Sequence, residues 1–193
     1  MKKNLPNILA FFVFFLLCVF AFGGNKGVAT LEENQETIKI TEVKERESYP
    51  VKITIKSIGV NAPIEAVGIL DGAMAVPTFS YNVGWYSLGT VPGEIGSAVL
   101  AGHVNWKNGE DAVFTNLKNV KIGDVISITE NYGNITNFKV VDIKSFPIDK
   151  DTTEIFSASD GIVRLNLITC DGSWNEYLKT HDSRLVVFSE KIY

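Results

Sequence analysis

The stretch Val163–Cys170, with the sequence VRLNLITC, is rich in apolar and β-branched residues, and this pattern predicts a β-strand. Asp171-Gly172 follows at once and predicts that the strand ends there in a turn. Cys170 would then be the last residue of a rigid strand, open to a loop in front, a position where catalytic groups are often mounted. The alternative is a small buried thiol, as most free cysteines are.

Short apolar or alternating runs separated by turn residues continue on both sides of this stretch. Helical patterns are short, around residues 112–117 and 151–157. The predicted strands are residues 51–56, 61–67, 73–76, 98–101, 125–129, 137–143, 163–169 and 184–188. About eight short strands indicate an all-β domain, either a closed or nearly closed barrel or a sandwich.

The amino-terminal residues have a different composition from the rest of the chain. Lys2 and Lys3 precede an uncharged apolar run, and residues 5–24 have about the 20 residues that a membrane-spanning helix needs. The length of the run favours an uncleaved anchor over a removable signal, and the lysines place everything after it outside the cell. We therefore expect residues 1–24 to be a transmembrane signal anchor, 25–49 a polar linker, and 50–193 one extracellular domain.

Composition limits the classes of partner and cofactor. The net charge is −4 and no basic stripe is present, so nucleic acid is not an expected partner. No His, Cys or Asp cluster has the spacing of metal ligands, and we expect neither a metal nor a cofactor. Of the two cysteines, Cys18 lies in the apolar run, so the exported part has one thiol. Without an internal disulfide partner, that thiol is either buried and inert or reactive.

A reactive thiol needs a base and a group that stabilises a developing oxyanion. His103 follows a predicted strand and a glycine, which mounts it rigidly, whereas His181 lies in a polar run and is the second candidate base. Arg164 lies on the same face of the predicted strand as Cys170, but six residues away, which is about 20 Å at the rise of a strand. Arg184 opens the last strand, and antiparallel pairing with the strand of Cys170 would place it beside the thiol.

Several motifs resemble those of one family. Residues 165–170 (LNLITC) resemble the T/I-x-T-C signature of sortases, the membrane-anchored cysteine transpeptidases of Gram-positive bacteria. Residues 58–64, 83–86, 92–103 and 184–188 are similar to further sortase segments, in the same order. The resemblance covers roughly residues 50–190 and is strongest to the class D to F group. It implies an eight-stranded sortase-type β-barrel with short helices.

The resemblance also implies roles for individual residues. Cys170 would be the nucleophile, His103 the general acid/base, Arg184 the stabiliser of the bound carbonyl or its oxyanion, and Thr169 would help to bind substrate. The implied reaction cleaves an LPXTG-like sorting signal of a secreted protein through a Cys170 thioester. The acyl group would then pass to a cell-wall amine, from lipid II or peptidoglycan.

Two other functions fit the same residues. One is a hydrolytic cysteine protease that uses the same Cys–His pair with water as acceptor. The other is a non-enzymatic surface-binding module with a buried thiol. In the enzymes, substrate specificity is expected in the loops at residues 145–160 and 171–183, the second being long enough for a working loop.

Overall fold

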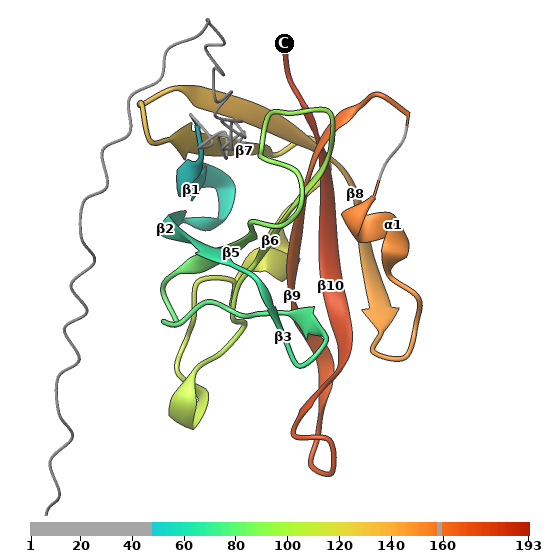
Figure 1. Ribbon diagram of the computed structural model, residues 1–193. Helices are drawn as coiled ribbons and strands as arrows, with labels where there is room; N and C mark the ends of the chain where they lie inside the picture. The colour runs from blue at the N-terminus through green and yellow to red at the C-terminus, as the bar shows by residue number, and fades with distance from the viewer. Residues whose placement is uncertain (1–47, 158–159) are drawn as a thin grey trace, which may run out of the picture. The chain divides into compact units, whose positions relative to one another are not determined.

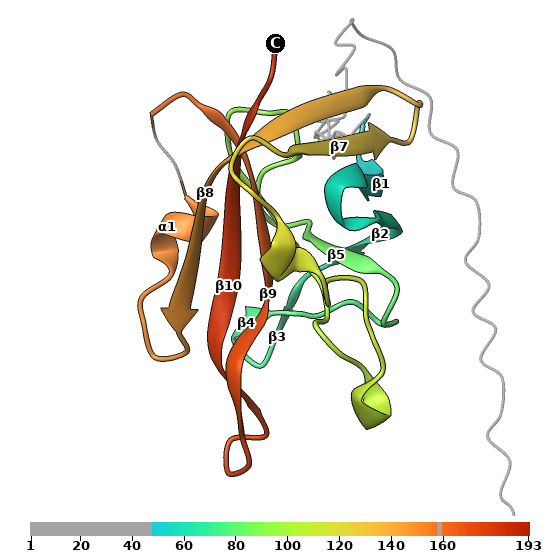
Figure 2. The same ribbon diagram turned by 180° about the vertical axis from the view of Figure 1, so that it is seen from behind.

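The computed structural model describes residues 48–157 and 160–193. Eight strands form a closed barrel in the order β1-β2-β5-β6-β9-β10-β8-β7, as Figures 1 and 2 show from opposite sides. This confirms the predicted all-β barrel and excludes the sandwich. The barrel strands are β1 (Pro50–Ile55), β2 (Val60–Val67), β5 (Val83–Tyr86), β6 (Gly96–Ala101), β7 (Val125–Glu130), β8 (Ile135–Pro147), β9 (Val163–Asn175) and β10 (Thr180–Lys191).

Most neighbouring strands are antiparallel, but the β2–β5 and β6–β9 pairs are parallel. Parallel neighbours need a crossover connection, and the one between β6 and β9 contains β7, β8 and the short helix α1 (Thr153–Phe156). The remaining pieces are a small hairpin of β3 (Ile69–Leu70) and β4 (Ala73–Met74), together with 3₁₀ turns at Lys56–Ile58, Lys107–Gly109 and Leu117–Asn119.

Alternation along β9 and β10 separates the core from the outer surface. Leu165 and Leu167 of β9 are fully buried and belong to the main core cluster, as does Val187 of β10. Cys170 and Arg184 have the opposite parity, so their side chains project from the outer face of the barrel.

Helix α1 covers part of this outer face. Its Ile155 is 1% exposed and packs in a second cluster with Val99 of β6 and Val186 of β10. The buried Asn166 side chain of β9 donates a hydrogen bond from Nδ2 to the Ile155 carbonyl oxygen, at 2.6 Å. These contacts hold α1 beside the strands that carry Cys170 and Arg184.

The prediction that the strand ends at Asp171-Gly172 is wrong. β9 continues to Asn175, and the expected working loop of residues 171–183 is instead a hairpin in which β9 and β10 remain paired up to Thr180. Gly172, at φ 76°, adopts a backbone conformation that suits a turn, but here it accommodates an irregularity in the ladder between His181 and Ser183.

Two further expectations differ from the structure. The strand predicted at residues 73–76 shortens to β4 and pairs with β3 outside the barrel, and β5 takes its place in the barrel. β5 escaped prediction because Val83–Tyr86 is short and shows no alternation, being buried at three of its four positions. The helical pattern at residues 112–117 is a turn followed by a 3₁₀ turn.

The expected signal anchor and nearly all of the expected linker lie outside the described residues. Within residues 48–157 and 160–193, no helix has the length and apolar character to cross a membrane.

Phe138 of β8 is fully buried in the main core cluster, so Phe138→Ala should lower the free energy of unfolding by about 3–5 kcal/mol through lost contacts and a residual cavity. Tyr132, which is 71% exposed, provides the control, and Tyr132→Ala should change the free energy of unfolding by less than about 0.5 kcal/mol. Denaturant unfolding measures both, and equal effects would contradict the assigned core.

Candidate active site

Cys170 and Arg184 are direct cross-strand partners in the β9–β10 ladder. Residues opposite each other on one face of an antiparallel pair have Cβ atoms about 5 Å apart. Both line a cleft of about 190 Å³ on the outer face of the barrel. The sequence-based expectation that Arg184 stands beside the thiol therefore agrees with the register. The thiol is free and partly exposed, which does not fit a buried, inert cysteine.

The walls of the cleft are largely apolar. Ile155 and Phe156 of α1 line it, as do Met74 of β4, Val76 just beyond β4, and Ile168 of β9. Such walls suit an apolar peptide side chain.

His103 lies in the segment after β6, and its neighbour Gly102 lines the cleft. Its Nε2 is 3.1 Å from the Pro77 carbonyl oxygen, and its ring meets the Trp106 ring edge to face, with centroids 5.0 Å apart. Because a carbonyl oxygen only accepts, we assign the proton of the neutral ring to Nε2, which leaves Nδ1 to accept a proton. Within the described residues His103 makes no hydrogen bond with Cys170, and it does not line the cleft.

Two hydrogen bonds tie the His103 segment to the strand of Cys170. The Gly102 N–H donates to the Ile168 carbonyl oxygen at 3.0 Å. The hydroxyl of Thr169, which is 4% exposed, donates to the Gly102 carbonyl oxygen at 2.8 Å. Thr169 thus lines the cleft while its hydroxyl hydrogen is used inside the protein. The predicted acid/base residue and nucleophile are therefore held on adjoining segments.

The other two candidates from the sequence lie elsewhere. His181 is on the hairpin, where its Nδ1 is 3.1 Å from the Gly172 carbonyl oxygen and its buried Nε2 has no partner among the described residues. It does not line the cleft. Arg164 projects from the same face of β9 as Cys170, but its guanidinium is bound by both carboxylate oxygens of Asp160, at 2.7 and 2.6 Å.

Sequence reasoning missed the cover of the cleft. A strand was predicted at residues 73–76, but no pattern in the sequence placed this segment at the cleft that holds Cys170. The short helix expected near residues 151–157 is present, and its apolar Ile155 and Phe156 were a usable signal for a buried contact.

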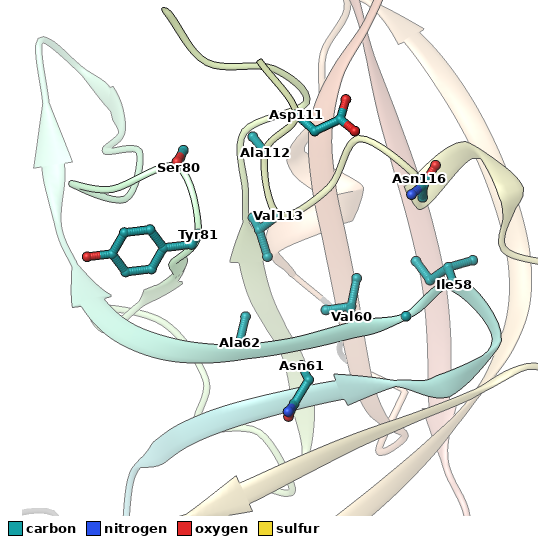
Figure 3. Close-up of a pocket in the computed structure, with 11 residues that line it drawn as sticks. Ile58, Val60, Asn61, Ala62, Ser80, Tyr81, Asp111, Ala112, Val113 and Asn116 are labelled. Carbon is teal, nitrogen blue, oxygen red and sulfur yellow. The ribbon is translucent and has the colours of Figure 1, made fainter.

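A second pocket, of about 290 Å³, lies between β2 and the turn that follows Asp111 (Figure 3). Val60 and Ala62 of β2 face Asp111 and Asn116 across it. It shares no lining residue with the cleft that holds Cys170.

Comparisons with known proteins place this geometry in a family. A model of the Sortase domain matches residues 53–192. Among solved structures, sortase C-1 of Actinomyces oris is 26% identical, covers 75% of each chain and has a TM-score of 0.59. Sortase C2 of Group B Streptococcus Pilus Island 1 is also 26% identical, over 74% of this chain and 73% of that one, with a TM-score of 0.57.

A lid mutant of sortase A from Corynebacterium diphtheriae is similar in fold, at 23% identity and a TM-score of 0.58 over 75% of this chain and 70% of that one. No curated protein sequence matches the chain.

Gly102 leaves no room for a side chain. A Cβ there would lie 2.5 Å from Phe114 Cδ2 and 2.7 Å from Val113 Cγ1. Gly102→Ala should therefore lower the free energy of unfolding by about 1–3 kcal/mol and displace the His103 segment. Gly68→Ala is the matched control, because nothing lies within 4 Å of a Cβ at that position. Denaturant unfolding checks both, and equal effects would contradict the close packing over Gly102.

The two hydrogen bonds from the Arg164 guanidinium, aided by the Ile162 N–H, lower the pKa of the Asp160 carboxyl from 3.8 to about 2. The pair should stabilise the fold fully above pH 3.8 and progressively less as the pH falls toward 2. Carbon-detected NMR titration should find this pKa, and Arg164→Gln should raise it while Lys139→Gln should not. An unchanged Asp160 pKa in Arg164→Gln would refute the pairing.

Proposed function

The chain belongs to the sortase family of cysteine transpeptidases, and from this we propose that Cys170 is the nucleophile, His103 the general acid/base and Arg184 the oxyanion stabiliser. The observation that supports this most is the register of β9 and β10, which sets Arg184 directly opposite the thiol in a shared cleft. Positive charge beside the attacked carbonyl favours acyl transfer, because the carbonyl oxygen becomes anionic in the transition state.

In the first half-reaction, His103 takes the proton of the Cys170 thiol, and the sulfur attacks the carbonyl carbon of the scissile peptide bond. The tetrahedral oxyanion forms beside the Arg184 guanidinium, and His103 gives a proton to the leaving amine as the C–N bond breaks. The product is a thioester on Cys170 and a free amine peptide.

In the second half-reaction, an amine attacks the thioester carbon and His103 accepts the proton that the nitrogen loses. The C–S bond breaks, His103 returns the proton to the sulfur and so regenerates the thiol, and a new amide bond joins the two partners. With Nε2 bonded to Pro77, Nδ1 is the atom of His103 that exchanges the proton. The reaction requires Nδ1 to come within hydrogen-bond reach of the Cys170 sulfur when substrate is bound, since hydrogen bonds at catalytic sites are often long before substrate binds.

Sortases as a family act on sorting signals and cell-wall amines. For this chain we propose an LPXTG-like signal at the C-terminus of a secreted protein, cleaved between Thr and Gly, with lipid II or peptidoglycan supplying the amine. The apolar walls formed by Ile155, Phe156 and Val76 favour an apolar side chain in the signal. Membrane anchorage through residues 1–24, with the catalytic domain outside the cell, and membership of class D to F are parts of the same proposal.

The test uses the full chain with a library of LPXTG-variant peptides, with and without candidate amines, and mass spectrometry of the products. Cys170→Ala should lower product formation by at least about 10³-fold, the order of loss seen when a nucleophile is removed. Cys18→Ala is the matched control and should retain full activity. Cleavage by Cys170→Ala would refute the assignment, and products that stay hydrolytic with every amine would favour the protease.

A further inference from the structure

Arg184 is held by its own strand. Its Nη1 donates to the carbonyl oxygens of His181 and Ser183, at 3.0 and 2.8 Å, and its Nη2 donates to the Thr180 hydroxyl at 3.0 Å. A guanidinium has five N–H donors. Three are used here, and within the described residues the Nε hydrogen and one Nη2 hydrogen have no protein partner. The guanidinium is therefore fixed in place and still has two donors for a substrate oxygen.

The acceptors that hold Arg184 are all neutral. No carboxylate within the described residues forms an ion pair with it, whereas Arg164 pairs with Asp160 at 2.6 Å and with Glu190 at 3.6 Å. A carboxylate partner would cancel most of the field that the guanidinium exerts on a nearby oxyanion. Carbonyl and hydroxyl oxygens orient the group and leave its charge uncompensated.

The hairpin carries a β-bulge next to this arginine. Arg184 pairs with Cys170 and Ser183 with Asp171, but His181 pairs with Trp174, so β9 has one extra residue. The glycine of the bulge, Gly172, has φ 76°, and a Cβ there would collide with the Asp182 carboxylate. That carboxylate accepts hydrogen bonds from the Ser173 N–H at 3.2 Å and the Ser183 hydroxyl at 3.0 Å.

Bulges bend a strand and re-aim its side chains, and they are frequent beside active sites. Here the extra residue is on β9, opposite the part of β10 that lies between Arg184 and the two residues that bind it from the start of β10, Thr180 and His181. The bulge of β9 therefore lies beside the hydroxyl and carbonyl groups of β10 that hold the Arg184 guanidinium.

We propose that Thr180 is a positioning residue: its hydroxyl, with the His181 carbonyl, fixes the guanidinium of Arg184 toward the reacting carbonyl at Cys170. This inference rests on the proposed function. Thr180 makes no contact with the thiol in the ladder, where it pairs with Asn175, so its effect on the reaction passes through Arg184.

The first experiment replaces the hydroxyl without changing the shape of the side chain. Thr180→Val should lower kcat/KM for acyl transfer by about tenfold, since a hydrogen bond to a charged group contributes roughly that factor. Thr180→Ser keeps the hydroxyl, and its kcat/KM should stay within about twofold of that of the unchanged protein. Thr129→Val, on β7 and outside the cleft, is the matched control and should have no effect. Valine favours strands, so the hairpin is preserved.

The second experiment reports the position of the charge without using catalysis. In a Cys18→Ala background, Cys170 is modified with an anionic and with a neutral methanethiosulfonate, and the ratio of rates is measured. The fixed guanidinium should favour the anionic reagent several-fold, on the order of threefold to tenfold. Arg184→Gln should remove this preference, and Thr180→Val should reduce it while Thr129→Val leaves it unchanged.

An unchanged rate ratio and unchanged kcat/KM in Thr180→Val would overturn the positioning role. A loss of kcat/KM with an unchanged ratio would also overturn it, because the effect would then not pass through the arginine. If Arg184→Gln retains full kcat/KM, the proposed role of Arg184 in the reaction fails, and that result is distinct from either outcome for Thr180.

Discussion

The antiparallel register of β9 and β10 is the constraint on which the site depends. It sets Arg184 opposite Cys170, and the alternation of the strands turns both side chains to the outer face while Leu165, Leu167 and Val187 fill the core. A shift of this register by one residue would turn the core side chains outward and bury the charge of Arg184. The packing that stabilises the barrel thus also fixes the pair that we propose for catalysis.

The proposed acid/base residue depends on a different kind of support. His103 follows the end of β6, and Gly102 joins it to β9 through the Ile168 carbonyl and the Thr169 hydroxyl. Phe114 closes over Gly102 from the other side, which only a glycine permits. The proposed nucleophile is thus held by a strand, and the proposed base by a segment that is bonded to that strand.

The sequence was sufficient for the all-β class of fold and for a strand that contains Cys170, because these follow from apolar patterns and from the order of short strands. It placed Arg184 beside the thiol only if the last two strands pair, and the register shows that they do. The sequence failed where one residue permits two conformations. Gly172 suits a turn and also a bulge, and only the pairing of its neighbours on β9, Asp171 with Ser183 and Trp174 with His181, decides between them. The cover of the cleft by Met74 and α1 depends on contacts between distant segments, which periodicity does not encode.

The most direct test of the account is intact-protein mass spectrometry of the enzyme mixed with a sorting-signal peptide and no added amine, followed by mapping of the modified residue. The account predicts an acyl adduct on Cys170 whose mass equals the peptide up to its scissile bond, and which an added amine releases as a new amide. Cleavage without any adduct, or an adduct on another residue, would contradict it.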